Sequence, residues 1–151
     1  MGGIVANNSG GARTLEYGKT EKYVEELEVV LSDGSQATFR PLSPTELEMK
    51  KAKQDFEGDI YRKMDALLTE NAALIEAHKP KVSKNSAGYG LWDVKRPEDK
   101  TFNLSSLICG SQGTLALWTR AKLRLVTPKE HRAMLVVFLT DLSLLPEIVK
   151  R

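Results

Sequence analysis

The alternation of apolar and polar residues predicts a β-hairpin early in the chain. Residues 23–31 place apolar side chains on one face, with the period of a half-buried strand: Leu27, Val29 and Leu31. The pair Asp33 and Gly34 then supports the positive φ angles of a tight hairpin turn. Residues 36–40 predict the returning strand.

A spacing of three to four between apolar residues predicts a pair of helices after this hairpin. Ser43 can cap the first helix, Pro44 suits its first turn and Glu46 completes a capping box. We expect that helix to reach about residue 54, where Asp55 can cap a second one. The apolar stripe of the second helix indicates a face on a core: Phe56, Ile60, Met64, Leu67, Leu68, Leu74 and Ile75.

The remaining sequence predicts an irregular stretch followed by strands. Residues 81–100 are basic and contain glycines and prolines, whereas residues 114–119, 122–126 and 133–139 have the composition of strands. Residues 141–151 have the spacing of a helix beginning. Strands and helices are segregated along the chain instead of alternating, so the predicted fold class is α+β with a mainly antiparallel sheet.

Composition and charge narrow the classes of function. The 151 residues are 41% hydrophobic and 28% charged, as in an ordinary soluble domain. A net charge of +2, with bases mixed among acids, argues against a nucleic-acid partner. The longest apolar run, residues 134–139, falls far short of the ~20 residues of a membrane-spanning helix, and no signal-peptide pattern opens the chain. With one cysteine, we expect a cytoplasmic protein without intrachain disulfides.

Two glycine-rich segments are the candidates for chemistry. Residues 2–11 read Gly-Gly-Ile-Val-Ala-Asn-Asn-Ser-Gly-Gly, and residues 110–115 read Gly-Ser-Gln-Gly-Thr-Leu. Glycine lets a backbone approach a bulky ligand and present N–H groups to it, and phosphates are common targets of such loops. Taken alone, each segment also fits a ligand-free alternative: a frayed terminus for the first, and a tight loop before a strand for the second.

Four segments in order resemble those of the FAD-linked oxidases, the vanillyl-alcohol-oxidase type of flavoprotein with a PCMH-type FAD-binding domain. Residues 2–11 are similar to the family's second flavin-contacting stretch, and residues 17–18 with 27–34 resemble its next strand and turn. Residues 84–91 resemble its Lys-Asn-x-x-Gly-Tyr-Asp-Leu segment, and residues 110–115 its Gly-Ser-Glu-Gly-Thr-Leu signature. The resemblance is closest to the D-lactate, glycolate and D-2-hydroxyglutarate dehydrogenase branch.

The sequence also departs from the family pattern. Gln112 stands in place of the usual Glu, which removes a charge near the expected flavin. Ala116 replaces a Gly, and Trp118 replaces a β-branched Ile. Residues 93–101 look like an insertion, relative to the family pattern, between the matching segments 84–91 and 110–115.

The resemblance implies a division into domains. Residues 1–128 would be the second half of the FAD-binding domain, with residues 43–80 as a helical insertion. Residues 129–151 would be the first strand and helix of the cap, the C-terminal domain of FAD-linked oxidases. The family's pyrophosphate loop would precede this chain, and its His-rich substrate and metal residues would follow it. We therefore expect a fragment that is inactive alone, with no catalytic or metal-binding residues of its own.

The cofactor that the resemblance implies is FAD. The residues expected to contact it are Gly2, Gly3, Asn7, Ser9, Gly10, Gly88, Tyr89, Gly110, Ser111, Gly113, Trp118 and Thr119. Small residues allow close approach, while Asn and Ser can hydrogen-bond to phosphate or flavin oxygens. Two readings stay open for Lys84 and Tyr89: contact with the isoalloxazine, or a solvent-facing lysine and a tyrosine that covers a core edge.

Three other residues could be reactive or bind metal, but the surrounding sequence does not support either role. Nothing near Cys109 suggests a thiolate, so a buried small residue is the favoured reading over a reactive thiol. His78 and His131 have no metal-ligand partner at a useful spacing, so we expect both at the surface.

The function predicted from the resemblance is that of an FAD-binding fragment of an oxidoreductase. The intact protein would oxidise a small D-2-hydroxy acid by hydride transfer to FAD. The alternative is a non-catalytic binding or assembly module that pairs with a separate chain, since the exposed edges of an incomplete sheet favour self-association. A third reading is a general nucleotide-phosphate binder.

Overall fold

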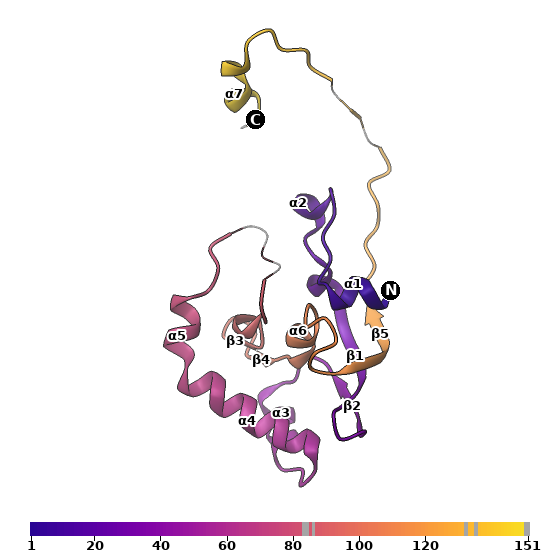
Figure 1. The fold of residues 1–151 in the computed structure, drawn as a ribbon, viewed down its shortest axis with the longest axis vertical. Helices are drawn as coiled ribbons and strands as arrows, with labels where there is room; N and C mark the ends of the chain where they lie inside the picture. Colours follow the sequence, from indigo (N-terminus) through magenta and orange to yellow (C-terminus); the bar gives the residue numbers. More distant parts are fainter. Residues whose placement is uncertain (83–84, 86, 132, 135, 150–151) are drawn as a thin grey trace.

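The computed structural model describes residues 1–82, 85, 87–131, 133–134 and 136–149. The main sheet of this described part has three antiparallel strands in the order β2-β1-β5 (Figure 1). They are β1 (Val24–Val30), β2 (Gln36–Phe39) and β5 (Leu117–Leu123). A separate two-stranded ribbon pairs β3 (Lys95–Arg96) with β4 (Thr101–Phe102). The described strands pair antiparallel and occur together with helices, which confirms the α+β fold class, although the helices lie before, between and after the strands and are not segregated from them.

The predicted hairpin is formed by β1 and β2. Leu27 pairs with Phe39 and Val30 with Gln36, and Gly34 takes the positive φ of +85° that the turn requires. Leu27 is fully buried. The alternating pattern therefore predicted both the strands and the face that meets the core.

The third strand differs from expectation, because one strand, β5, replaces the predicted strands at 114–119 and 122–126. Thr114 belongs to a turn, where its amide donates to the Ser111 carbonyl at 3.0 Å. The strand ends at Leu123 because β1, its partner in the described sheet, begins at Val24 opposite it. The described residues of 133–139 form no strand, since no neighbouring strand takes up their backbone groups.

Helices form where the spacing predicted them. The capping box of Ser43 and Glu46 is present at the start of α3 (Pro44–Lys51), which ends a few residues before the predicted end. The second helix is divided into α4 (Phe56–Glu70) and α5 (Ala72–Ala77). The break lies at Asn71, whose side-chain amide donates to the Leu67 carbonyl at 2.9 Å and so competes with the helical backbone.

Short helical turns complete the described chain. Before the sheet lie α1 (Gly2–Ala6), α2 (Thr14–Tyr17) and η1 (Thr20–Tyr23). Between α5 and β5 lie η2 (Leu91–Asp93) and α6 (Leu104–Ile108), and at the C-terminal end lie η3 (Leu142–Leu144) and α7 (Leu145–Val149). The first glycine segment was expected to be a loop, but part of it is α1, because the buried Val5 anchors this turn in the core.

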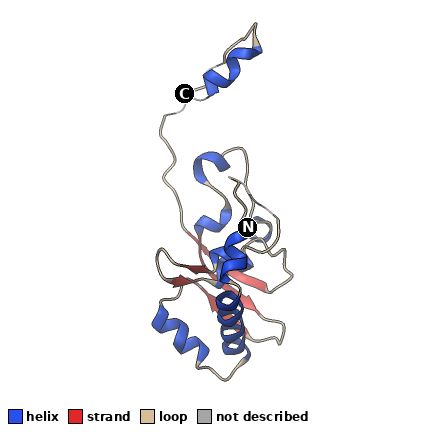
Figure 2. Ribbon diagram, turned by 90° about the vertical axis from the view of Figure 1, so that its left-hand side faces the viewer, coloured by secondary structure: helices blue, strands red, loops and turns tan. Residues whose placement is uncertain are grey.

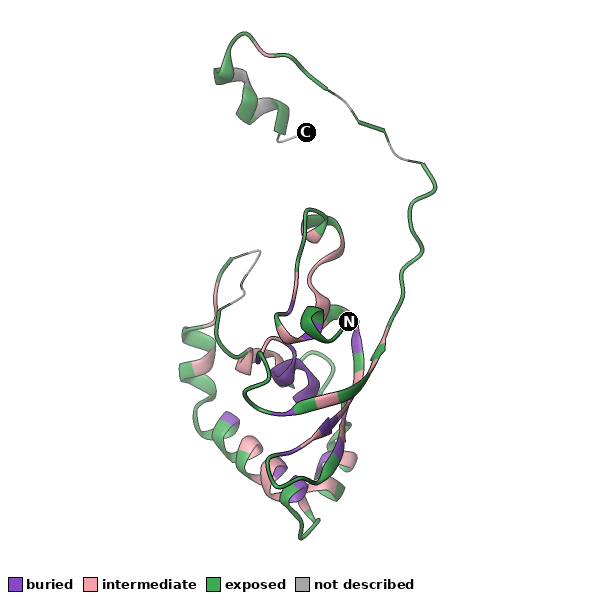
Figure 3. Cartoon of the chain, turned by 45° about the vertical axis from the view of Figure 1, so that its right-hand side comes forward, coloured by how far each residue is buried: buried purple, intermediate pink, exposed green. Residues whose placement is uncertain are grey.

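The core lies between the sheet, α4 and α6. Tyr61 from α4 is fully buried, with its ring edge-on to Phe39 and tilted against Phe102. Figure 3 shows the buried residues gathered in the sheet and α6, while the segment after β5 is exposed along most of its length. In Figure 2 this segment leaves the body of the protein and carries α7 away from it. None of the described helices is long and apolar enough to cross a membrane.

Candidate functional site

The two glycine-rich segments lie side by side. The Gly110 amide donates to the Val5 carbonyl at 2.9 Å, and the Gln112 amide donates to the Ala6 carbonyl at 3.0 Å. The loop after α6 is thereby joined to the C-terminal end of α1 (Figure 1). These amides are used within the protein, so they are not the bare N–H groups that the sequence suggested for a phosphate.

Asn8 holds the first segment in place. Its φ is +46°, in the left-handed region that Asn tolerates better than most residues. The Asn8 Oδ1 atom accepts a 3.0 Å hydrogen bond from the Glu21 amide, and Nδ2 donates to the Glu21 carboxylate. The neighbouring Ser9 carbonyl accepts from both the amide and the hydroxyl of Thr20. Sequence reasoning selected Asn7 and Ser9 and missed Asn8, because adjacent asparagines look alike in sequence.

Ser111 presents a buried hydroxyl without a partner. The residue is 2% exposed, and its Oγ atom makes no hydrogen bond within the described part of the chain. A buried hydroxyl normally finds a partner, because leaving it unpaired costs about 1–3 kcal/mol. This atom is an unfilled donor and acceptor inside the second glycine segment, which fits a site for a polar cofactor.

Open space surrounds several of the glycines. A Cβ added at Gly3, Gly11, Gly88 or Gly113 would meet no atom within 4 Å. A Cβ at Gly2 would lie 3.7 Å from the indole nitrogen of Trp118, so Trp118 stands beside the first segment. Tyr89 is connected to the second segment, since its hydroxyl lies 2.9 Å from that of Thr114. The glycine surface is thus flanked by two aromatic side chains, an arrangement that suits a flat ring system.

A small cavity of about 220 Å³ opens beside these segments. Its walls include Gly88 and Gly110 from the predicted set, together with Asn8, Lys19, Glu21, Asn85, Asp93 and Cys109. The Lys19 side chain is only 11% exposed; its ammonium donates to the Asn85 carbonyl and lies 3.7 Å from the Glu21 carboxylate. Lys19 was missed, and the local signal that could have pointed to it is the preceding Gly18, whose φ is +84°.

Cys109 is buried at the edge of this cavity. It is 4% exposed, and burial, reinforced by the negative charge of Glu21, raises the pKa of its thiol to about 12. A thiol with so high a pKa is a poor nucleophile at neutral pH. The reading of Cys109 as a small buried residue is confirmed.

Other predicted residues face elsewhere. A Cβ at Gly10 would lie 2.6 Å from the Thr14 hydroxyl, so Gly10 faces α2. The Thr119 hydroxyl donates to the Glu28 carbonyl at 3.4 Å on the exposed part of the sheet. Asn7 is exposed at the end of α1. Lys84 lies outside the described residues.

The chain is similar in sequence to an FAD binding domain and to known dehydrogenases. Residues 1–40 match a family model described as FAD binding domain. A D-2-hydroxyglutarate dehydrogenase of Pseudomonas putida is 35% identical over 136 residues, which cover 90% of this chain and 13% of that protein. The enzyme of the same name from Escherichia coli is 32% identical over 140 residues, 91% of this chain and 14% of the relative. A D-lactate dehydrogenase of Archaeoglobus fulgidus is 28% identical over 137 residues, 91% of this chain and 19% of the relative.

These matches agree with the resemblance read from the four segments. The chain spans only 13 to 14% of the length of the two D-2-hydroxyglutarate dehydrogenases, so it corresponds to a short part of each. The predicted cofactor, FAD, is the one that the matching domain model names. The resemblance is therefore confirmed: residues 1–40 match an FAD binding domain, and about 90% of this chain is similar to a short part of D-2-hydroxyglutarate and D-lactate dehydrogenases.

Proposed function

We propose that this chain forms one side of the FAD site of a flavin-dependent dehydrogenase that oxidises a small D-2-hydroxy acid. The observation that carries the proposal is the pairing of Gly110 with Val5, which brings two distant glycine-rich segments together. The first of these segments lies within the residues that match an FAD binding domain. FAD, when bound, supplies the hydride acceptor, and the task of the chain is to hold and orient it.

The residues of the site divide this task. Gly3 and Gly113 leave open space for close approach, and the partnerless hydroxyl of Ser111 supplies a hydrogen bond. Trp118 beside Gly2 provides an aromatic flank. The other proposed contacts are Ser9, Gly88, Tyr89 and Gly110. Asn7, Gly10 and Thr119 face elsewhere in this structure, so their contact with FAD stays a prediction from the resemblance alone.

The division into domains belongs to the same proposal. Residues 1–128 act as the FAD-binding part, and residues 129–151 as the start of the cap. The base and the substrate-binding groups come from outside this chain, so the chain alone does not oxidise a 2-hydroxy acid. Turnover of D-lactate or D-2-hydroxyglutarate with a dye acceptor by the isolated chain would contradict this part.

The test is an FAD titration that follows one tryptophan. The protein has two, Trp92 and Trp118, so Trp92→Phe leaves Trp118 as the only indole. We expect saturable quenching at micromolar FAD. Replacement of Ser111 by Ala should weaken binding about three- to tenfold, which corresponds to one hydrogen bond, and Ser35→Ala in the distant hairpin turn should not change it.

Two outcomes would count against the proposal. An absence of quenching, with the fold verified by circular dichroism, would show that the chain offers no usable FAD surface by itself. Competition by ADP but not by FMN would instead favour a general nucleotide-phosphate site.

A second proposal, self-association, is favoured by the exposed apolar side chains after β5. Phe138 is 93% exposed, and further apolar residues of this segment are exposed with it: Leu125, Val126, Met134, Val136 and Val137. In the described sheet, β2 and β5 are also edge strands with free outer sides. Light scattering should show oligomers that Phe138→Asp disrupts and Leu15→Asp, at an equally exposed site, does not. A monomer across a wide concentration range would overturn this second proposal.

A further inference from the structure

A large hollow in the described part of the chain lies away from the glycine-rich segments. It has a volume of about 830 Å³ and runs between the α4–α5 helices on one side and the β3–β4 ribbon on the other. Cavities that hold small molecules are typically of this size, about 300–1,000 Å³. We call this hollow the α5 groove.

The floor of the α5 groove is apolar. Leu47 from α3, Leu68 from α4 and Phe102 from β4 are all buried beneath it. Ile75 and Leu91 line it as partly buried residues packed on the same core. Such a floor suits an aliphatic chain, because each methylene that leaves water contributes to binding.

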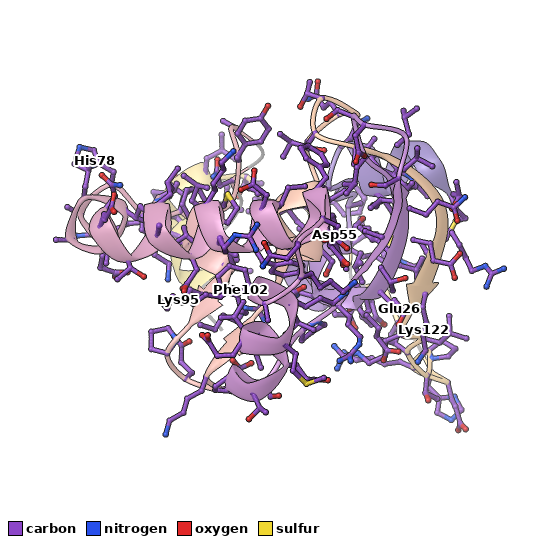
Figure 4. The ribbon with its side chains drawn as sticks, turned by 90° about the horizontal axis from the view of Figure 1, so that it is seen from below. Glu26, Asp55, His78, Lys95, Phe102 and Lys122 are labelled. Carbon is purple, nitrogen blue, oxygen red and sulfur yellow. The ribbon has the colours of Figure 1, made fainter. Side chains whose placement is uncertain are left out.

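The rim of the groove is charged, with an excess of positive groups. Four basic residues line it against two acidic ones: Lys79, Lys95, Arg96 and Lys100 against Glu76 and Glu98. Lys95 bonds to Asp65 at 3.0 Å and to Thr69 at 2.9 Å, which ties the ribbon to α4 and fixes the width between the two walls. Figure 4 shows Lys95 and Phe102 together beneath this helix.

Of the four rim cations, only Lys95 forms an ion pair with a described residue. Within the described residues, no carboxylate lies within salt-bridge distance of Lys79 or Lys100. Arg96 also lacks an ion pair with a described residue, but its Nε atom donates a 3.2 Å hydrogen bond to the Asp93 backbone carbonyl. The uncommitted ammonium groups above an apolar floor are complementary to a carboxylate head on an apolar tail.

We propose that the α5 groove binds a small amphipathic carboxylate, with its aliphatic chain on the floor and its carboxylate at the Lys79 and Lys100 rim. This function is additional to the proposed FAD site and does not depend on it. Lys79 and Trp92 also line the small cavity beside the glycine-rich segments, so the two sites share a wall. An occupant of the groove therefore reaches residues that border the proposed cofactor site.

Trp92 reports on the groove, just as Trp118 reports on the FAD site. In a Trp118→Phe protein, titration with decanoate below its micelle concentration should change Trp92 emission saturably. Across hexanoate, octanoate and decanoate, affinity should rise about three- to fourfold per methylene. Decanol should bind about tenfold more weakly than decanoate, because it lacks the charge that the rim recognises.

A matched pair of variants separates the groove from general surface adsorption. Ala72 and Ala73 are adjacent exposed residues of α5, and of the two only Ala72 lines the groove. Replacement of Ala72 by Glu should weaken decanoate binding about tenfold by placing a negative charge in the groove, whereas Ala73→Glu should change it by about twofold at most. Lys100→Asn, at a residue whose φ of +55° Asn tolerates, should also weaken binding.

Three outcomes would overturn the proposal. The first is an absence of saturable binding by a protein that circular dichroism shows to be folded. The second is equal binding of decanoate and decanol, or equal effects of the two alanine variants, which would indicate non-specific adsorption. The third is a dimer that Ala72→Glu but not Ala73→Glu dissociates, without decanoate binding, which would assign the groove to a second copy of the chain. FAD affinity, measured through Trp118, is independent of all three.

Discussion

Gly110 faces Asn8 so closely that a Cβ atom added to Gly110 would lie 3.1 Å from the Asn8 Cβ. Gly110 also has a φ of +92°, which side-chain-bearing residues rarely adopt. Both the positive φ and the close contact with Asn8 therefore favour glycine at the point where the two glycine-rich segments meet.

Replacement of Gly110 by Ala should therefore destabilise the fold more than replacement of Gly113. Gly113 shares the positive φ, at +78°, but a Cβ there meets nothing within 4 Å. We expect a loss of about 1 kcal/mol for Gly113→Ala from backbone strain alone, and about 2–3 kcal/mol for Gly110→Ala. Urea unfolding of both variants measures the difference, and equal losses would show that the contact with Asn8 costs nothing.

Gly58 should be intolerant of Ala although it lies in a helix. Its added Cβ would lie 2.2 Å from the Lys53 carbonyl oxygen, a backbone atom that cannot move independently. The clash should outweigh the gain in helix propensity of up to about 1 kcal/mol, with a net loss of about 2 kcal/mol. Gly3→Ala, in a helix with open space around it, is the matched control and should not destabilise. A more stable Gly58→Ala protein in thermal unfolding would contradict the close packing of α4 on the preceding loop.

Tyr61 should tolerate loss of its hydroxyl but not of its ring. Its hydroxyl is buried without a partner in the described part of the protein, and burial raises the pKa of this phenol above its usual value. Tyr61→Phe should thus be as stable as the parent or more so, while Tyr61→Ala should lose about 3–5 kcal/mol. Calorimetry on the two variants measures both changes in stability. A marked loss of stability in Tyr61→Phe would reveal a hydrogen-bond partner for the hydroxyl.

The capping box of α3 should give an acid-dependent contribution to stability. The backbone N–H of Ser43, followed by the Arg40 guanidinium and the Ser43 hydroxyl, lowers the pKa of Glu46 from 4.5 to about 2. Because the folded-state pKa is depressed, the contribution is present above pH 4.5 and is lost as the pH falls towards 2. The difference in Tm between the parent and Glu46→Gln should be largest near pH 6 and vanish near pH 2. A difference that stays constant across this range would refute the role of the charge.

Most features of the fold that the sequence predicted correctly depend on short patterns of neighbouring residues. The hairpin rests on alternation and an Asp-Gly turn, and α3 rests on a box of Ser43 and Glu46; each needs only a few neighbouring residues. The conformation of Gly2–Ala6 was missed because it depends on Val5 entering a core built from distant residues. The end of β5 was missed for the same reason, since its partner β1 determines it.

The candidate site shows the same limit. Family resemblance drew attention to both glycine-rich segments, and the hydrogen bonds of Gly110 and Gln112 join them. Lys19 was not foreseen, because its burial depends on Asn85, far along the chain. The α5 groove was also not foreseen, since its walls come from α4, α5 and a ribbon with two residues per strand that has no clear periodicity.

The order of strands in the sheet affects how the protein is made. The β1–β2 hairpin can pair as soon as residue 39 leaves the ribosome, but β5, on the other side of β1, emerges on the order of ten seconds later at ordinary rates of translation. During that interval one edge of β1 is unpaired, and the Val5 carbonyl lacks the hydrogen bond that the Gly110 amide later donates to it. The nascent chain therefore exposes an unpaired edge of β1 until β5 pairs with it. Chaperone binding during synthesis should be concentrated in that interval.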